Sequence, residues 1–342
     1  MNRRAIVAVC AAAILVAVAA YAATEYLGYR ARQAAPSEVD TIAAEPGADV
    51  GAGDGGTIVF RNTAQGAGYG QVASVPLGEP AGVRTLAPAA CDRIDSTGSA
   101  RLCLSIDRGV VTTFTATLYD GQWRAQQSWP LPGVPSRTRF SGDGALVAFS
   151  AFITGESYAT VGFSIATTIV TLAGAAPAAT VDLEDFAFSV GGQPVTSADR
   201  NFWGVTFAAG DTFYATGASA GRTWLVRGDL KARTLVAIRE NAECPSLSPD
   251  GTRVAYKTRI EGTPAGQWSI AVLDLATGRQ TVLPEQHSVD DQPEWLDDST
   301  VLYGLPRADA AGDSDVWSVA ANGTEAPVLL IEHAWSPAAM RP

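Results

Sequence analysis

Five charged residues precede short apolar segments in a way that could bring them together: Asp199, Arg200, Glu243, Asp290 and Asp291. Each stands just before an apolar run that a turn follows. Carboxylates that converge from several segments can bind a hard cation such as calcium, or attract a basic partner. Charged side chains are mostly solvent-exposed, so solvated loop residues are the simpler interpretation.

Two histidines, His287 and His333, are the imidazoles available for acid–base chemistry. A Ser-His-Asp hydrolase needs one of them beside a nucleophile, and nothing in the sequence pairs either one. The chain has no His-x-x-His or Cys-x-x-Cys spacing of the kind that binds zinc. We therefore expect both histidines to be structural or solvated, with no catalytic residue, no metal and no cofactor.

Cys91 and Cys103 are the cysteines whose spacing predicts a disulfide. If Ser96-Thr97-Gly98 is a turn, each cysteine lies six residues from Thr97, and the two face each other across a hairpin near disulfide distance. Such a bond persists outside the cytoplasm; two reduced, buried thiols are the alternative. Cys244 is then expected to be unpaired and buried.

The elements that position these residues are hairpins that recur along the chain. In "ECPSLSPDGTRVAYKTR", Leu247 precedes the turn Ser248-Pro249-Asp250-Gly251, whose residue types favour a tight turn. The same pattern places Ile94, Phe140, Phe207, Trp295 and Trp335 at the equivalent position, at spacings of 46, 67, 40, 48 and 40 residues. Periods of 40–50 residues with several short strands each are typical of propeller blades.

The ends of the repeat region predict how the ring closes. "TIVFRN", "GQVASVPLG" and "VRTLAPAA" supply the second, third and fourth strands of a blade, and "HAWSPAAMRP" supplies a first strand and stops. Together they complete one blade. The sequence therefore predicts an all-β, six-bladed β-propeller in which N- and C-terminal strands pair, without an exposed sheet edge. The long interval after Phe140 holds an extra hairpin, "FAFSVGGQPVT".

The repeats "PSLSPDGTRVAY" and "AWSP" resemble those of the TolB-like six-bladed propellers, which are WD-repeat-like in form. More narrowly, "DRNFWGVTFAAGDTFYAT", "ECPSLSPDGTRVAYKTR", "DDQPEWLDDSTVLYGLPR" and "AWSPA" resemble actinobacterial membrane-anchored TolB-like translocation proteins. The resemblance covers residues 57–342 and implies a fold rather than an activity. TolB itself carries an α/β domain ahead of its propeller, whereas this chain has an anchor and a linker there, so a Tol–Pal role is not implied.

The N-terminal region divides into residues 1–23 and 24–56, ahead of the propeller at 57–342. After Asn2-Arg3-Arg4, residues 5–23 are nineteen consecutive apolar residues, just enough to span a bilayer core. Positive charge before the run predicts a single-pass membrane anchor with the propeller outside the cytoplasm. Ala20-Tyr21-Ala22 leaves open a cleaved signal peptide and a secreted protein. Residues 24–56, rich in glycine and acidic residues, are expected to be a flexible linker.

Composition limits the classes of partner. The net charge is −11, and the 24 basic residues include only two lysines, Lys231 and Lys257. Without a basic stripe we expect no nucleic-acid partner.

We therefore expect a non-catalytic scaffold in the cell envelope that binds a protein or an envelope component. The first alternative is an enzyme at the channel mouth, such as a metal-dependent hydrolase or lactonase. The second is a carbohydrate-binding propeller that uses Trp203, Trp295 or Trp335 as stacking platforms, although recurrence at repeat positions favours a core role for these tryptophans.

Overall fold

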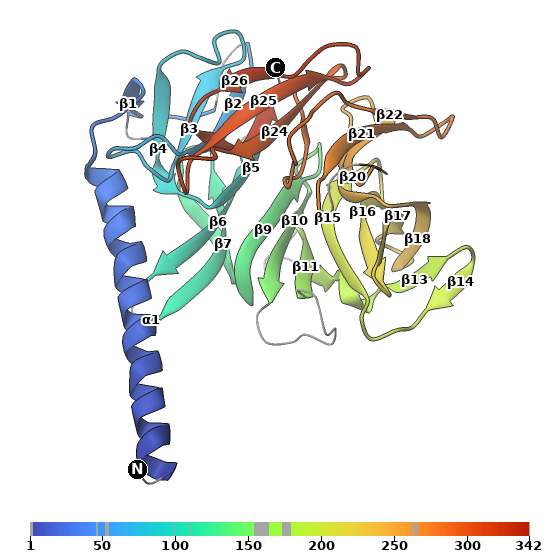
Figure 1. Cartoon of the computed structure of the whole chain (residues 1–342). Helices are drawn as coiled ribbons and strands as arrows, with labels where there is room; N and C mark the ends of the chain where they lie inside the picture. Colours follow the sequence, from blue (N-terminus) through green and yellow to red (C-terminus); the bar gives the residue numbers. More distant parts are fainter. Residues whose placement is uncertain are drawn as a thin grey trace.

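Six β-sheets surround a central axis, and one long helix projects away from them (Figure 1). The computed structural model describes residues 3–341 except 46, 52–54, 99, 110, 154–163, 173–178, 261 and 263–265. Part of the expected linker, namely Pro46 and residues 52–54, thus lies outside the described residues. Each sheet is one blade, numbered here from the N-terminus.

The first three blades comprise the following strands: blade 1, β2 (Thr57–Asn62), β3 (Gln71–Pro76), β4 (Arg84–Ala90) and β27 (Ala334–Met340); blade 2, β5 (Arg93–Thr97), β6 (Ala100–Arg108), β7 (Thr112–Asp120) and β8 (Ala125–Pro130); blade 3, β9 (Gly133–Phe140), β10 (Leu146–Ile153), β11 (Ser164–Thr171) and β12 (Ala179–Asp182). The other three comprise these: blade 4, β15 (Asn201–Phe207), β16 (Thr212–Ser219), β17 (Arg222–Asp229) and β18 (Thr234–Glu240); blade 5, β19 (Glu243–Leu247), β20 (Arg253–Thr258), β21 (Ser269–Asp274) and β22 (Gln280–Val282); blade 6, β23 (Glu294–Trp295), β24 (Thr300–Pro306), β25 (Ser314–Ala320) and β26 (Val328–Ile331).

The ring closes through blade 1, as the sequence predicts. The C-terminal strand β27 pairs antiparallel with β2, from Thr57 opposite Met340 to Asn62 opposite Ala334. The innermost strands contact one another in the order β27, β5, β9, β15, β19, β23 and back to β27. The prediction of six blades with terminal closure is confirmed.

A hydrophobic cluster fills the space between each pair of adjacent blades. In β20, Val254 and Tyr256 pack toward blade 4, whereas Ala255 packs toward blade 6. In β24, Val301 and Tyr303 likewise pack toward blade 5. Because the middle strands are buried on both faces, their sequences read as continuous apolar runs rather than alternating ones.

Two repeat positions differ from the predicted alignment. Ile94 and Trp335 were expected just before a turn, but both lie early in their strands, β5 and β27. The Ser336-Pro337 pair, which resembles the start of a turn, lies inside β27. Ser336 has a φ of +54° beside a register shift in the pairing with β2. It therefore forms a bulge, which a short motif does not distinguish from a turn.

Strand β13 (Ala187–Val190) and strand β14 (Gln193–Val195) form the extra hairpin predicted within the long interval. A single-turn 3-10 helix, η1 (Leu183–Asp185), precedes them. β13 pairs in parallel with β18, so the hairpin widens blade 4 to six strands.

The N-terminal helix α1 spans Arg3–Ala34, eleven residues beyond the predicted apolar run. Its segment Val9–Arg32 has a mean hydropathy of 1.7 and the length of a membrane span; a signal sequence has the same properties. After α1, β1 (Thr41–Ala43) pairs in parallel with β4 and makes blade 1 five-stranded. The region expected to be a flexible linker thus contains a helix end, an outer strand and the buried Val50.

Contacts to blade 1 hold the end of α1 in place. The rings of Tyr29 and Tyr69 meet edge to face with centroids 5.8 Å apart, and the Arg32 guanidinium lies 5.2 Å from the centroid of the Tyr69 ring. The backbone N–H of Gly66 also donates to the Arg32 carbonyl. These contacts fix the direction in which α1 leaves the propeller.

Cys91 and Cys103 form the predicted disulfide, with their Cα atoms 5.3 Å apart. The pairing is confirmed, but the expected register is wrong. Thr97 pairs with Ala100, and Cys103 lies opposite Ile94. Cys91 reaches Cys103 because it precedes β5, in the connection from blade 1. Cys244 is buried and outside a disulfide, as expected.

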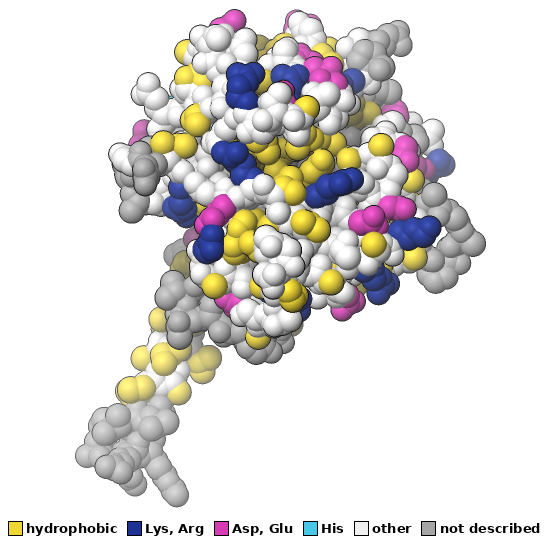
Figure 2. Space-filling model, turned by 90° about the vertical axis from the view of Figure 1, so that its right-hand side faces the viewer, with side chains coloured by type: hydrophobic (Ala, Val, Ile, Leu, Met, Phe, Trp, Pro, Cys, Tyr) yellow, Lys and Arg dark blue, Asp and Glu magenta, His cyan; other side chains and the backbone are white. Residues whose placement is uncertain are grey.

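The face at the right of Figure 1 carries hydrophobic side chains in its centre, with Lys and Arg side chains beside them (Figure 2). Exposed hydrophobic residues of the outer strands include Val236 and Ile238 of β18 and Val282 of β22. Acidic and basic groups are interspersed on this face, which is typical of a soluble surface.

Candidate functional site

The central channel is closed midway by ion pairs between blades. Asp291, which precedes β23, lies 2.8 Å from an Arg93 guanidinium nitrogen of β5 and 4.0 Å from that of Arg137 in β9. Arg139 of β9 pairs with Glu294 of β23, and its guanidinium also donates to the Pro293 carbonyl. A cavity of only about 20 Å³ remains among these groups.

Burial shifts the pKa values of two charged groups in this layer. Desolvation lowers the pKa of Arg93 to about 10; the like charge of Arg137 adds to the effect, and Asp291 opposes it. Desolvation raises the pKa of Asp95, although Arg139 and the Phe140 N–H, which donates to its Oδ2 at 2.6 Å, oppose this shift. Both shifts indicate that the channel interior is poorly solvated.

Three of the five predicted site residues converge at the channel end where the innermost strands begin. The Lys257 ammonium lies 2.5 Å from Asp290 Oδ1 and 3.8 Å from Glu243 Oε2. Arg137 donates to the Asp290 carbonyl and faces Asp291, which links this cluster to the ion-pair layer. These carboxylates therefore face cationic side chains, an arrangement that disfavours calcium binding there.

Asp199 and Arg200 have their described contacts elsewhere, within blade 4 and beside η1. Asp199 accepts hydrogen bonds from the Ser219 hydroxyl at 2.7 Å and the Ala220 N–H at 2.6 Å. Arg200 lies within electrostatic range of Glu184. The sequence placed all five residues in equivalent loops. The added β13–β14 hairpin gives the loop before β15 different neighbours.

One motif escaped the sequence analysis. Gly217-Ala218-Ser219-Ala220-Gly221 has the spacing of a hydrolase nucleophile turn, which joins a strand to a helix. Here it forms the hairpin between β16 and β17, and the Ser219 hydroxyl donates to Asp199. Each histidine has its described carboxylate partner elsewhere: His287 with Glu285, and His333 with Asp313. This Ser219 thus lacks the context of a nucleophile.

A large cavity opens at the other end of the channel, where the innermost strands end. We call it the funnel: a space of about 990 Å³ bordered by the ends of β5, β9, β15, β19, β23 and β27 and by the turns that follow β5, β9, β15 and β19. Phe140, Phe207, Leu247 and Trp295 supply apolar wall. Asp95, Arg139, Glu294 and Arg341 supply charge. Cavities of this size and mixed chemistry are typical ligand sites.

Polar atoms at the base of the funnel are buried and have no hydrogen-bond partner among the described residues. These are the hydroxyl of Ser96 and the Nε of Arg139. The Thr138 hydroxyl, which belongs to the lining of the cavity of about 20 Å³, is likewise buried without a hydrogen-bond partner among the described residues. Buried polar groups are normally hydrogen-bonded, so these donors favour a ligand or water with acceptor atoms at the funnel base.

The three predicted stacking tryptophans differ in exposure. Trp203 and Trp295 are 6% and 1% exposed, so they belong to the core. The Trp295 indole N–H donates to the Ser246 carbonyl, and the Arg253 guanidinium lies 5.4 Å from its ring centroid. Trp335 is partly buried, and the Arg93 guanidinium lies 4.7 Å from its ring centroid.

Comparisons with known proteins give only distant structural likeness. No protein-family model matches the chain, and no curated protein matches it. A hydrazine synthase structure from Kuenenia stuttgartiensis is 14% identical with a TM-score of 0.46, covering 81% of this chain and 75% of that chain. The propeller domain of the Trilobed protease from Pyrococcus furiosus is 13% identical with a TM-score of 0.39, covering 68% and 69%.

An apocarotenoid oxygenase mutant from Synechocystis is 14% identical, with a TM-score of 0.43 and coverage of 80% and 71%. A chimera of that oxygenase is 14% identical with a TM-score of 0.42; the chain covers 64% of its length, just under two thirds. Likeness of this degree carries no inference about activity. The class of protein, a six-bladed β-propeller with terminal closure, rests on the sheet order.

Proposed function

We propose that this protein is a membrane-anchored, extracytoplasmic β-propeller that binds a segment of an envelope protein, without catalysing a reaction. The observation that carries the proposal is the funnel, whose apolar wall surrounds buried donors that have no hydrogen-bond partner within the described part of the chain. A polypeptide segment offers both apolar side chains and carbonyl acceptors, so it suits this lining. Capture of a non-protein component of the cell envelope is an alternative outcome of the test below.

Two features support the extracytoplasmic location. Arg3 and Arg4 precede the apolar part of α1, and positive charge at that end favours its retention in the cytoplasm. A Cys91–Cys103 disulfide is stable in an oxidising compartment. Cleavage after Ala20-Tyr21-Ala22 would instead release the protein, and the contacts of Tyr29 and Arg32 with blade 1 would survive it.

The ion pairs at the channel mouth favour binding over hydrolysis. A metal-dependent hydrolase or lactonase would need Glu243, Asp290 or Asp291 as ligands of a cation. Each already faces Lys257, Arg93 or Arg137, and a cation there would have to displace these charges. The enzyme alternative therefore has less support than the scaffold. Membership of the TolB-like group remains an expectation from the sequence.

A steric block of the funnel tests the proposal. Gly142 lines the funnel, its φ lies outside the left-handed region, and an added Cβ would meet no atom within 4 Å. The variant Gly142→Trp should therefore fold and add bulk at the edge of the funnel. Gly78, on the exposed β3–β4 turn, has the same freedom and lies outside the funnel, so Gly78→Trp is the matched control.

The measurement is cross-linking and capture from membranes with the full-length chain, compared with an anchor-only fragment. We expect capture of an envelope protein that falls at least tenfold in Gly142→Trp and is unchanged in Gly78→Trp. Capture no greater than that of the anchor-only fragment would reject the scaffold. Capture that Gly142→Trp leaves intact would reject the funnel as its site.

A further inference from the structure

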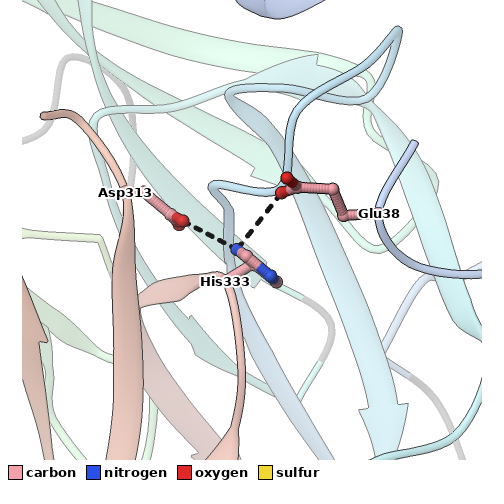
Figure 3. Close-up of side chains that lie close together, drawn as sticks. All are labelled: Glu38, Asp313 and His333. Atoms are coloured by element: carbon pink, nitrogen blue, oxygen red, sulfur yellow. Dashed lines mark hydrogen bonds and ion pairs between the residues drawn. The ribbon is translucent and has the colours of Figure 1, made fainter. Parts of the chain in front are cut away.

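Three potential metal ligands from distant parts of the chain meet where α1 joins the ring (Figure 3). Glu38 lies between α1 and β1, Asp313 just before β25, and His333 between β26 and β27. His333 Nδ1 is 2.7 Å from Asp313 Oδ2 and 3.6 Å from Glu38 Oε2. Asp313 and His333 are buried, whereas the Glu38 side chain is 42% exposed.

Hydrogen bonds orient the Asp313 carboxylate toward the histidine. Its Oδ1 accepts from the Thr63 hydroxyl at 2.7 Å and from the Ser314 N–H at 2.8 Å. Oδ2 faces His333 Nδ1 at 2.7 Å and the Arg307 Nε at 3.7 Å. Hydrogen bonds to the oxygen that does not bind the metal hold metal-binding carboxylates in a defined orientation.

The backbone of His333 is also fixed. Its N–H donates to Asp315 Oδ1 at 2.8 Å, and its carbonyl accepts from the Thr63 N–H and an Arg84 guanidinium N–H, each at 2.9 Å. These bonds hold His333 at a φ of +48°, in the left-handed region that a non-glycine residue rarely adopts. Such conformations persist where surrounding contacts impose them, and they cluster at functional sites.

The charges around the cluster leave a negative excess. Four carboxylates, from Glu38, Asp313, Asp315 and Glu332, lie near two guanidiniums, those of Arg84 and Arg307. Arg307 is already paired with Asp313, Asp315 and Glu332, and Arg84 donates to the carbonyls of Glu332 and His333. The excess remains negative when Arg32, which lies over the Tyr69 ring, is also counted. Carboxylates therefore outnumber guanidiniums around the three residues, an arrangement that favours added positive charge.

We propose that Glu38, Asp313 and His333 bind a divalent transition-metal ion, with zinc as the best match. The ion fastens the segment after α1 to the connections that precede β25 and β27. One imidazole and two carboxylates, with water completing the shell, form a zinc-type donor set, whereas calcium and magnesium prefer oxygen alone. Ligand atoms on tetrahedral zinc lie about 3.3 Å apart. Glu38 is already near that spacing from His333, and Asp313 needs to move by less than about 1 Å.

The sequence alone could not reveal this site, because its ligands are spread over almost the whole chain. Glu38 lies in the region expected to be a linker, and Asp313 in a connection between strands. Terminal closure brings them to His333. The exposed Glu38 offers the ion a route from solvent.

Metal binding to the full-length chain, purified without a histidine tag in detergent micelles and stripped with a chelator, tests the proposal. We expect one Zn²⁺ per chain by calorimetry and a higher thermal unfolding midpoint with zinc. Co²⁺ should give a ligand-field absorption band that reports coordination directly. Glu38→Gln, an exposed and nearly isosteric change, should weaken binding at least tenfold, and His333→Gln should abolish it.

The other histidine provides the matched control. His287 Nδ1 lies 2.7 Å from Glu285 Oε1, the same distance as in the His333–Asp313 pair, and no third ligand accompanies it among the described residues. The variant His287→Gln should bind zinc as the parent does. Absence of stoichiometric zinc, or equal binding by the parent and Glu38→Gln, would overturn the proposal. Glu38→Gln decides the question if His333→Gln fails to fold.

Discussion

The carboxylate of Asp291 lies 2.8 Å from the guanidinium of Arg93, although the two residues are separated by 198 positions in the chain. Arg93 begins the innermost strand of blade 2, and Asp291 precedes that of blade 6. They meet because a single strand, β27 of blade 1, lies between the innermost strands of blades 2 and 6 around the axis. The ion pair therefore depends on the closed ring.

Removing Asp291 should be strongly destabilising. The Asp291 and Arg93 side chains are 2% and 14% exposed, so Asp291→Ala leaves the buried Arg93 guanidinium beside Arg137 without the carboxylate that pairs with it. We expect the free energy of unfolding to fall by about 3–5 kcal/mol, as for other broken buried pairs. Glu240→Ala, which breaks the ion pair with Arg222 in which both side chains are more than half exposed, should cost much less. Denaturant unfolding measures both, and equal losses would contradict the buried-pair account.

Adding a side chain at Gly304 should disturb the closure. A Cβ on Gly304 of β24 would lie 2.4 Å from ring carbons of Trp335 in β27. We expect Gly304→Val to lower the free energy of unfolding by about 1–3 kcal/mol through overpacking. In a double-mutant cycle with Trp335→Ala the losses should be less than additive, because the second change removes the clash. Gly78→Val, in open space, is the control, and strict additivity would exclude the contact.

The disulfide gives a prediction about thiols and stability. Under denaturing, non-reducing conditions, thiol titration should detect Cys10 and Cys244, and reduction should add Cys91 and Cys103. Reduction, or Cys91→Ala combined with Cys103→Ala, should lower the free energy of unfolding by about 2–4 kcal/mol. Cys10→Ser should have little effect. Detection of all four thiols before reduction would show that the bond is absent.

The turn carboxylate of Asp250 should make stability pH-dependent. A hydrogen bond from the Ser248 hydroxyl is the largest of the causes that hold the pKa of Asp250 at about 2, below its ordinary value of 3.8; bonds from Thr252 add to it. A lowered folded-state pKa stabilises the protein above about pH 4, and this contribution is lost as the pH falls toward 2.

Asp250→Ala should therefore be less stable than the parent at pH 7, and the difference should narrow between pH 4 and pH 2. Urea unfolding at several pH values measures this difference. Asp143 occupies the same place in the turn after β9, and a hydrogen bond from Ser141 lowers its pKa. Its alanine variant should change in the same direction. A difference in unfolding free energy between the parent and Asp250→Ala that stays constant with pH would contradict the role assigned to Asp250.

The fold was predictable because its signals are local and repeated. Turns such as Ser248–Gly251 and buried runs such as Val254–Tyr256 recur at the spacing of blades, and unmatched strands at the two ends determine the closure. The site was only partly predictable. Glu243, Asp290 and Asp291 lie near one another, but their basic partners Lys257 and Arg137 lie inside strands, where no loop pattern marks them.

Longer-range features escaped prediction for a physical reason. The funnel forms where six strand ends meet, and the funnel itself has no sequence motif. The Cys91–Cys103 bond was predicted from a hairpin register that the chain does not adopt, and succeeded because the connection before β5 approaches the same strand. The helix extension to Ala34 was missed because Glu25, Arg30 and Arg32 interrupt the apolar pattern without interrupting helix formation.

The pairing of β1 with β4 has a mechanical consequence. Tension applied to α1 passes first to Tyr69 and to the three residue pairs between β1 and β4, at the outer rim of blade 1. The pairing between β2 and β27 lies at the opposite edge of the same sheet, three strands further in. Tension on the helix therefore separates the outer strands of blade 1 one at a time before it reaches the hydrogen bonds between β2 and β27 that close the ring.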